Sequence, residues 1–342
     1  MLRVGVVGYG TGGQHFHTPF IDAANGCKLT GIVARAEATV AKVRADWPHV
    51  PVFPSLTAMI DAGVCDAVTI TTPPQTRRVL VLEAIEAGLH VIADKPFGPN
   101  HEGAMELDAA AKKRSVTLGV YQNRRFDADL QTLKKVMDDG RLGRISRIHS
   151  RMDQNSPQTV EAGPSGGLLR DLGSHVVDQM IYLLGPVTSV DAQLDIADLP
   201  AGPTDVGFTL TLLHQGGARS HISASKLNHI DARELRAYGD RGCYLSQTTD
   251  VQAQDIFAGK RPADDLASWG FEPRANWGTL FTAAGPVTVP SEQGRYHDFY
   301  EAFALSVATG TPPPVTAETG ARTLAVLDAA RQSADERQRI LL

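Results

Sequence analysis

The stretch GVVGYGTGG, residues 5–13, decides the fold, because a short apolar run passes directly into a glycine-rich turn. Gly8, Gly10 and Gly13 fit the pattern G-x-G-x-x-G, which binds the pyrophosphate of a dinucleotide. Gly8 permits the tight turn, Gly10 lets backbone N–H groups approach the phosphates, and Gly13 lets the next helix pack closely on the strand. An isolated match would more often be a turn that binds nothing, so the surrounding sequence decides its meaning.

Apolar runs alternate with helical segments after this motif. The runs predict strands at 2–8, 29–34, 67–71, 90–93 and 117–120, and the segments between them with helical spacing are 36–46, 76–88 and 101–114. This alternation predicts a parallel sheet with helices on both faces. In that setting the motif predicts a Rossmann dinucleotide-binding domain over residues 1–122. We expect its loop to contact the cofactor through Gly8, Gly10, Thr11, Gly12 and Gly13.

Pro19 sets the course of the first helix. A proline cannot continue a helix that begins at Gly12, because it lacks the N–H group. We therefore predict a first turn at residues 12–17 and a restart with Thr18 as N-cap and Pro19 at the first helical position.

The rest of the chain, residues 123–342, predicts a second domain. A chain of 342 residues exceeds the limit of roughly 250–300 residues for one hydrophobic core. Helices are predicted at 128–139, 168–184, 294–309 and 316–335, and strands at 145–152, 187–196, 204–213, 218–225, 233–239 and 242–247. Such a run of strands is typical of an antiparallel or mixed sheet capped by helices on one face.

Composition narrows the function classes. The net charge of −5 argues against generic nucleic-acid binding. No apolar stretch reaches the roughly 18 residues of a membrane span, and the N-terminus lacks a signal-type segment, so we expect a cytoplasmic protein that binds no membrane. Cys27, Cys65 and Cys243 are odd in number and far apart. We interpret them as buried or incidental thiols rather than a disulfide framework.

The end of the second strand bears on the choice between NAD and NADP. A site for NAD commonly has an acid there that binds the ribose 2′-OH, but the stretch 32–35, IVAR, contains none. Arg35 can pair with the 2′-phosphate of NADP through charge-assisted hydrogen bonds. We therefore predict a preference for NADP, with NAD use possible. In the alternative, Arg35 is a solvated loop residue and Glu37 contacts the ribose of NAD.

The stretch DKPFG, residues 94–98, follows the fourth predicted strand. Ligands of open parallel sheets bind outside the carboxyl ends of the strands, so Lys95 is expected to project toward the nicotinamide. An ammonium there can hydrogen-bond the substrate oxygen that changes charge during hydride transfer. The alternative is a surface lysine in a βα loop, and this stretch alone leaves both interpretations open.

Asp171, His175 and Asp178 are spaced i, i+4 and i+7, which puts them on one face of the helix 168–184. A histidine one turn from a carboxylate can be held in one tautomer and remove a proton from an alcohol. The alternatives are a helix cap for Asp171 and a buried structural hydrogen bond for Asp178. Without a Cys or another nearby His the spacing is poor for zinc, and we expect no metal ion.

Together these motifs resemble those of the Gfo/Idh/MocA oxidoreductases over essentially the whole chain. The glycine loop resembles the family's phosphate motif, residues 94–96 its Glu-Lys-Pro signature, and residues 171–175 its Asp-x-Gly-x-His motif. The stretches GYGTGGQHFHTPFI, NRRFDADLQTLKK and DLGSHVVDQ further resemble a subgroup that includes NADP-linked scyllo-inositol dehydrogenases.

The resemblance implies a Rossmann domain followed by an α/β domain with a large open, mostly antiparallel sheet, through which the chain forms a homodimer or homotetramer. Lys95 matches the family's catalytic lysine, His175 its acid/base and Asp171 the partner of that histidine. At residues 72–77 this chain has TPPQTR where relatives often have Thr-Pro-Asn followed by His, so contacts with the adenosine side are expected to differ. Arg170 also replaces a frequent aromatic or apolar residue.

Further contacts follow from position along the chain. We expect Thr72, Pro73 and Lys95 to contact the cofactor. The expected substrate contacts are Lys95, Asn123, Arg124, Asp153, Asp171 and His175. For Arg125 we favour an interdomain salt bridge.

The sequence therefore predicts an NADP-dependent oxidoreductase that transfers hydride between nicotinamide and a secondary alcohol or ketone of a cyclitol, polyol or sugar. One alternative is a non-catalytic regulator that senses a dinucleotide or sugar, because a fold alone does not determine function. Another is an enzyme that holds its cofactor tightly and uses transient oxidation for elimination or epimerisation.

Overall fold

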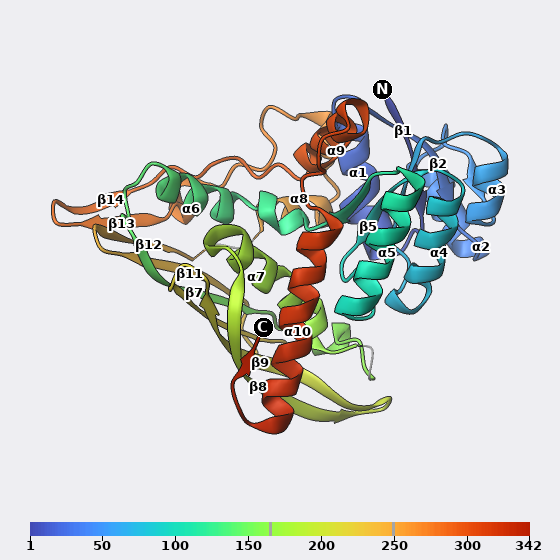
Figure 1. Cartoon of the computed structure of the whole chain (residues 1–342). Helices are drawn as coiled ribbons and strands as arrows, with labels where there is room; N and C mark the ends of the chain where they lie inside the picture. The colour runs from blue at the N-terminus through green and yellow to red at the C-terminus, as the bar shows by residue number, and fades with distance from the viewer. Residues whose placement is uncertain (164–165, 248–249) are drawn as a thin grey trace. The chain divides into compact units, whose positions relative to one another are not determined.

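Figure 1 shows the computed structural model of the chain, which describes residues 1–163, 166–247 and 250–342. The chain forms two compact units. The first contains residues 1–123, 252–269 and 295–321, and the second contains 124–251, 270–294 and 322–342. A single division between residues 122 and 123 therefore leaves out the two later segments that return to the first unit.

The first unit contains a six-stranded parallel sheet. Its strands are β1 (Leu2–Val7), β2 (Cys27–Val33), β3 (Val52–Phe53), β4 (Ala67–Ile70), β5 (His90–Asp94) and β6 (Leu118–Tyr121). They are ordered β3-β2-β1-β4-β5-β6, and every neighbouring pair is parallel. The order reverses between β1 and β4, and a ligand of such a sheet binds outside the carboxyl ends at this point. The predicted Rossmann architecture is confirmed.

Helices cover both faces of this sheet. They are α1 (Thr18–Ala23), α2 (Glu37–Asp46), α3 (Leu56–Asp61), α4 (Pro74–Glu86), α5 (His101–Arg114) and α9 (His297–Thr309). The short helix α8 (Val251–Phe257) contacts the segment after the glycine loop, where Phe257 lies beside His15 and Phe16. α3, α4 and α5 pack in succession, with α4 and α5 side by side in Figure 1, whereas α1 packs against α9. Right-handed crossovers place α1 and the group α3 to α5 on opposite faces, because the chain reverses direction across the sheet after β3.

The predicted restart at Thr18 is wrong in detail. Gly12–His17 forms a π-helical segment that passes without interruption into α1, and His17 rather than Thr18 is the N-cap. Pro19 therefore occupies the second helical position. The wider π turn accommodates the missing N–H of Pro19, and Thr18 Oγ1 donates to the carbonyl of Gly13 at 3.0 Å.

The second unit contains a nine-stranded sheet. Its strands are β7 (Ile145–Asp153), β8 (Val187–Leu199), β9 (Gly202–His214), β10 (Arg219–Ser225), β11 (Ala232–Gly239), β12 (Gly242–Ser246), β13 (Thr279–Thr282), β14 (Gly285–Thr288) and β15 (Ile340–Leu341). Their order is β14-β13-β12-β11-β7-β10-β9-β8-β15. Within the described residues, β7 and β10 are parallel and the other neighbours antiparallel. The expected mostly antiparallel sheet is confirmed.

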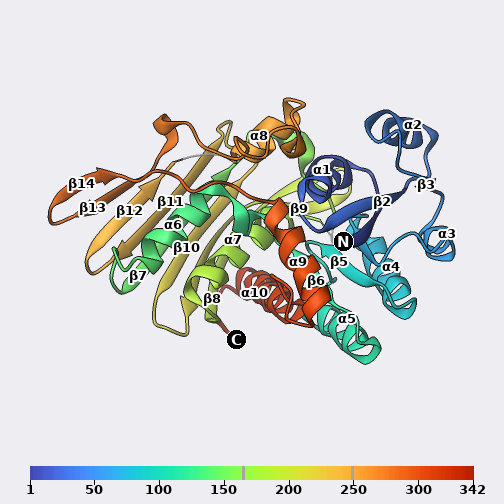
Figure 2. The same cartoon turned by 90° about the horizontal axis from the view of Figure 1, so that it is seen from above.

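One face of this sheet is covered by α6 (Ala128–Asp138) and α7 (Leu168–Leu184), as Figure 2 shows. α7 packs on β7, β9 and β10, and its buried apolar residues include Leu172, Val176 and Met180. These residues recur every four positions, so one stripe of the helix faces the sheet. The last long helix, α10 (Ala317–Glu336), contributes Leu327 beside Gly173 of α7.

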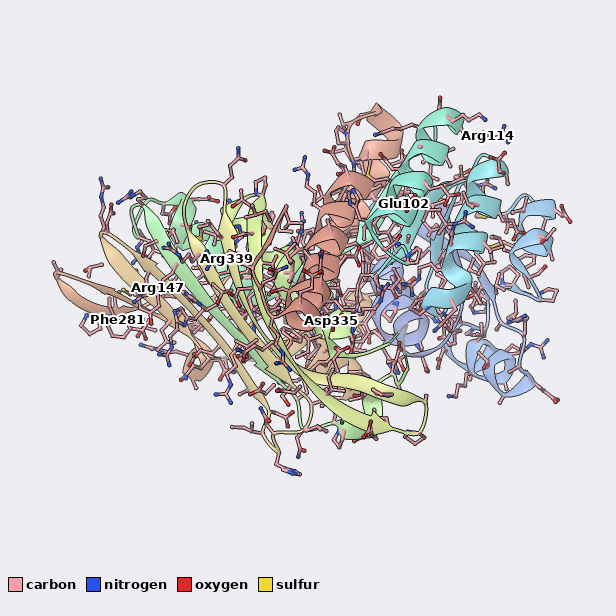
Figure 3. All side chains as sticks on the ribbon, turned by 60° about the horizontal axis from the view of Figure 1, so that its bottom comes forward. Glu102, Arg114, Arg147, Phe281, Asp335 and Arg339 are labelled. Carbon is pink, nitrogen blue, oxygen red and sulfur yellow. The ribbon has the colours of Figure 1, made fainter. Side chains whose placement is uncertain are left out.

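The other face of the sheet carries exposed side chains, among them Arg147 on β7 and Phe281 on β13 (Figure 3). Cross-strand pairing places them in one continuous row that runs from β13 to β9. Its members are Phe281, Cys243, Tyr238, Arg147, Arg219 and Leu213. The row mixes apolar, aromatic and cationic groups, a composition common at protein interfaces.

Over residues 1–163, 166–247 and 250–342, no helix combines the length and the apolar character that crossing a bilayer requires.

Candidate active site

The glycine loop follows β1 and fits a dinucleotide. Gly8 has a φ of 105°, a left-handed conformation that favours glycine. A Cβ on Gly13 would overlap the carbonyl oxygen of Gly8, whereas a Cβ on Gly10 would meet nothing within 4 Å. Gly13 is thus required for the close turn, and Gly10 leaves open space beside the backbone, as a bound pyrophosphate needs.

Arg35 follows β2 at the same edge of the sheet. Its side chain is exposed, and within the described residues it makes no hydrogen bond or ion pair. The backbone just before it is anchored, because the N–H of Ala34 donates to the carbonyl of Phe53 at 3.1 Å. Glu37 lies at the start of α2, so the end of β2 itself carries no acid.

The turn that carries Lys95 lies beside the glycine loop. The backbone N–H of Lys95 donates to Asp94 Oδ1 at 2.8 Å, and Thr71 Oγ1 donates to Asp94 Oδ2 at 3.0 Å. A Cβ on Gly12 would overlap Thr71 Oγ1 and lie 3.3 Å from Asp94 Oδ2. The carboxyl ends of β4 and β5 and the glycine loop therefore share one edge, as the motifs predict.

Arg77 is a residue of this edge that sequence analysis did not single out for a role. Its side chain is buried, and Nη1 donates to the carbonyls of Asp94 at 2.9 Å and Pro96 at 2.6 Å. Nη2 donates to the carbonyl of Thr72 at 2.7 Å. One guanidinium thus joins the backbone on both sides of Lys95 to the turn that holds Thr72 and Pro73. An arginine in the first turn of a helix carries no sequence signal for such a role.

The carboxylate of Asp94 is part of a buried polar cluster. His17 Nε2 lies 3.4 Å from Asp94 Oδ2, and His17 Nδ1 shares a hydrogen bond of 2.6 Å with the hydroxyl of Tyr300. Burial alone would raise the pKa of Asp94, but the contact with His17 and the charges of Arg77 and Lys95 hold that pKa well below its ordinary value. Asp94 is therefore a carboxylate at neutral pH and anchors the backbone N–H next to it.

α7 carries the two motif residues of the second unit. Its N-cap is Gly167, whose carbonyl accepts from the N–H of Asp171, and His175 follows one turn later with its side chain buried. Asp171 is thus inside the first turn and is not the N-cap. Asp171 Oδ2 accepts a hydrogen bond of 2.8 Å from Lys226 Nζ. Lys226 is a second residue that sequence analysis missed, because a single lysine after a strand carries no motif.

Asp178 is structural, as one interpretation of the sequence holds. Both of its oxygens accept 2.7 Å hydrogen bonds from Arg125, a buried bidentate pair. Both residues lie in the second unit, so the interdomain salt bridge expected for Arg125 is wrong. The pair instead joins the segment after β6, which carries Arg125, to α7, which carries Asp178.

The remaining predicted substrate residues lie near the ends of strands. Asn123 begins the 3₁₀ turn Asn123–Phe126 and is buried, and it belongs to the first unit. Arg124, in the second unit, contacts Asp127 at 3.2 Å and Asp250 at 3.7 Å. Asp153 ends β7 and accepts from Arg151.

The two expected catalytic residues lie in different units: Lys95 belongs to the first unit and His175 to the second.

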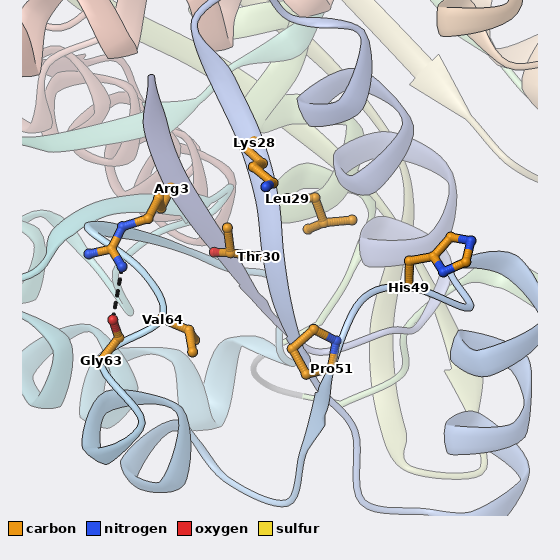
Figure 4. A pocket seen from close by; sticks show the side chains of 8 residues that line it. All are labelled: Arg3, Lys28, Leu29, Thr30, His49, Pro51, Gly63 and Val64. Carbon is orange, nitrogen blue, oxygen red and sulfur yellow. Dashed lines mark hydrogen bonds between the residues drawn. The ribbon is translucent and has the colours of Figure 1, made fainter.

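A hollow elsewhere in the first unit is lined by Arg3 and Lys28, near the amino ends of β1 and β2, and by the loop residues His49, Pro51 and Val64 (Figure 4). Arg3 Nη1 donates to the carbonyl of Gly63 at 2.9 Å. The carboxyl ends of the strands, where the glycine loop and Lys95 lie, are at the opposite edge. This hollow is therefore not the dinucleotide edge.

Family models match both parts of the chain. Residues 2–122 match an oxidoreductase family with an NAD-binding Rossmann fold, and residues 130–245 match the GFO/IDH/MocA C-terminal domain. These two matches cover most of the chain.

Individual relatives agree with the family matches. The chain is 30% identical over 351 residues to scyllo-inositol 2-dehydrogenase (NADP(+)) IolW of Bacillus subtilis, covering 100% of this chain and 96% of the relative. It is 29% identical over 196 residues to inositol 2-dehydrogenase of Corynebacterium glutamicum, covering 56% and 57%. The solved structure of the oxidoreductase yvaA of Bacillus subtilis has a TM-score of 0.90 and 29% identity, with 100% of both chains covered.

Proposed function

Because the chain belongs to the Gfo/Idh/MocA oxidoreductase family, whose relatives act on alcohol groups, we propose that it is an NADP-dependent dehydrogenase of a secondary alcohol in a cyclitol, polyol or sugar. The observation that carries the proposal is the shared edge of the first unit. There the glycine loop, Asp94 and Lys95 lie together at the carboxyl ends of the strands.

The residues of this edge fit a nicotinamide dinucleotide. The glycine loop would hold the pyrophosphate, and the turn at Thr72 and Pro73 would contact the rest of the nucleotide. When bound, the nicotinamide supplies the hydride acceptor or donor. The chain's own task is to bind the alcohol, orient it and move its proton.

Lys95 and His175 would share that task. The ammonium of Lys95 would donate a hydrogen bond to the reacting oxygen, and His175 would accept the hydroxyl proton as general base. Asp171, one turn from His175, would keep a negative charge beside the imidazole. Reduction of the ketone is the reverse, with His175 returning the proton. Asn123, Arg124 and Asp153 would contact other hydroxyl groups of the substrate.

Arg35 is the basis for proposing NADP. Its exposed guanidinium makes no hydrogen bond or ion pair within the part of the chain that the structure describes, and it follows a strand end without an acid, so it can pair with a 2′-phosphate. A relative that is an NADP(+)-linked scyllo-inositol dehydrogenase supports the same choice.

The decisive experiment assays inositols, aldoses and their keto forms with NADP(H) and NAD(H), following the absorbance of the reduced nicotinamide. We expect turnover of at least one polyol and a higher kcat/KM with NADP. Lys95→Ala and His175→Ala should each lower kcat by about 10²- to 10⁴-fold while the cofactor Kd stays nearly constant. Unchanged turnover in either variant would remove that residue from the mechanism, and an enzyme active on no alcohol would overturn the proposal.

Cofactor choice has its own test. Arg35→Asp should raise the KM for NADP by about 10- to 100-fold, because a charge-assisted hydrogen bond is lost and a like charge is added. Glu37→Gln is the matched control and should leave the KM for NADP unchanged. Equal use of NAD by the unmodified enzyme would contradict the assignment.

We also propose that copies associate as a homodimer or homotetramer through the uncovered face of the nine-stranded sheet. The row that contains Phe281 and Arg147 supports this, because it combines aromatic and arginine side chains, which are enriched at interfaces. Light scattering of the unmodified protein and of Phe281→Asp tests it: the variant should have the smaller mass.

A further inference from the structure

Lys226 is a buried cation for which the mechanism above has no use. It follows directly after β10, and the parallel pairing of β10 with β7 sets Ser225 opposite Asp153. Carboxyl ends of parallel strands meet at one edge of a sheet, so Lys226 is placed beside the end of β7. The Lys226 side chain is 5% exposed, which is rare for a lysine.

The ammonium of Lys226 uses only part of its hydrogen-bonding capacity. Nζ donates to Asp171 Oδ2 at 2.8 Å and to the carbonyl of Thr159 at 3.3 Å. An ammonium has three donors, and across residues 1–163, 166–247 and 250–342 no third acceptor is within hydrogen-bond distance. A buried donor without an acceptor costs free energy, so a site that retains one is suited to a ligand that supplies the acceptor.

The two partners differ in how far solvent reaches them. The side chain of Asp171 is 35% exposed, whereas that of Lys226 is 5% exposed. The carboxylate of Asp171 therefore reaches solvent, and the ammonium of Lys226 lies behind it. Asp171 also precedes His175 by one helical turn, so a ligand that touches the pair lies beside the proposed general base.

We propose that Lys226 is a substrate-binding residue that donates its third N–H to a hydroxyl oxygen of the polyol, while Asp171 accepts from a hydroxyl of the same molecule. The pair has no net charge and offers a donor and an acceptor side by side, which matches adjacent hydroxyl groups. This inference rests on the proposed function and specifies the substrate class as an uncharged polyol or cyclitol rather than a sugar acid. A lysine without its aspartate would favour a carboxylate instead.

The first test is equilibrium binding by calorimetry, with scyllo-inositol, glucose and gluconate as probes of the holoprotein. Lys226→Met should weaken binding of whichever uncharged probe the unmodified protein binds by about 10- to 100-fold, and its KM should rise in parallel. The cofactor Kd should not change. Lys134→Met is the matched control, because Lys134 pairs with Asp138 on the surface of α6 and should alter neither value.

Asp171→Asn provides a second test, in which the affinity for an anionic probe should increase. It leaves Lys226 without a counter-charge, so the affinity for gluconate should rise by about tenfold or more while that for the uncharged probe falls. Lys226→Arg keeps the cation, so it should bind the uncharged probe more tightly than Lys226→Met does. Circular dichroism checks that each variant is folded, and the double variant Lys226→Met/Asp171→Asn removes both charges if Lys226→Met alone unfolds.

The outcomes separate the two proposals. If Lys226→Met, or the double variant, binds the uncharged probe as tightly as the unmodified protein, the role of Lys226 is overturned even where turnover exists. If the unmodified protein binds gluconate and no uncharged probe, the substrate class is overturned. If it binds an uncharged probe through Lys226 but transfers no hydride, the dehydrogenase proposal fails and the binding role stands.

Discussion

A single buried guanidinium fixes the backbone of the proposed catalytic lysine. Arg77 donates to the carbonyls of Asp94 and Pro96, on either side of Lys95, and the carboxylate of Asp94 accepts from the N–H of Lys95. The backbone at Lys95 is thus held from both directions by charge-assisted hydrogen bonds. Displacement of a reacting group by about 1 Å can cost about a hundredfold in rate, so this support bears directly on turnover.

Arg77→Met is expected to lower kcat by about 10- to 100-fold, because the turn around Lys95 loses three donors. Steady-state kinetics measures the effect. Added guanidinium ions should restore part of the activity to Arg77→Ala. Arg78→Met is the control: Arg78 pairs with Glu106 at the surface, and its loss should leave kcat unchanged. Equal effects of the two substitutions would contradict the positioning role.

The cysteines provide a test of burial at the residue scale. Burial raises the pKa of the Cys27 thiol to about 12 and that of the Cys65 thiol to about 11. At pH 8 only about 0.1% of a thiol with a pKa near 11 is thiolate, the reactive form. Iodoacetamide should therefore label both residues far more slowly in the native protein than in urea, as peptide mass spectrometry would show. Labelling at equal rates in the two conditions would contradict their burial.

At the scale of elements, the glycines of the proposed nucleotide-binding loop have different surroundings. Gly13 is packed against the carbonyl of Gly8, and Gly10 faces open space. The two glycines therefore serve different purposes within the same turn. Gly13 is needed for the loop to form, and we propose that Gly10 leaves room for the phosphate to approach it.

Substitution by alanine should separate these purposes. Gly13→Ala should lower the free energy of unfolding by about 1–3 kcal/mol even without cofactor, because its Cβ overlaps backbone. Gly10→Ala should leave the stability of the cofactor-free protein nearly unchanged and weaken NADP binding. Urea denaturation and fluorescence titration measure the two quantities. Similar stability losses in both variants would show that Gly10 also has a structural role.

At the scale of the whole molecule, the first unit depends on segments far along the chain. α9, from residues 295–321, packs on α1, and Tyr300 hydrogen-bonds the buried His17. Tyr121 stacks edge-on with Phe299, their ring centroids 4.9 Å apart. The Rossmann sheet therefore completes its core only after most of the chain has been synthesised.

A fragment of residues 1–122 tests this dependence. It lacks α9, so Tyr121 and His17 would lose their partners and apolar surface would be exposed. We expect the fragment to bind a hydrophobic dye such as ANS and to unfold without a sharp transition, whereas the full chain unfolds cooperatively. Circular dichroism and dye fluorescence provide the measurements. A fragment with cooperative unfolding and no dye binding would show that α9 is dispensable.

Several elements follow from local pattern alone. The helices 101–114 and 168–184 are predicted with the observed bounds, because long amphipathic segments with clear ends carry strong periodicity. β3 and β15 are missed because two residues are too short to show a period. β13 and β14 are missed because most of their residues are not buried, whereas β4 and β6, of the same length, are buried throughout and appear as apolar runs. The restart at Thr18 is wrong because proline chemistry predicts an interruption but does not distinguish a cap from a π turn.

The sequence by itself determined the class of fold and the family, through motifs that contain the glycine loop, Lys95, Asp171 and His175, because periodicity and short motifs are encoded in neighbouring residues. Only the tertiary structure decided that Arg77 holds the turn around Lys95 and that Lys226 pairs with Asp171, 55 positions away. Such partners are chosen by which segments are buried together, and a buried charge must find an acceptor wherever the packing places one.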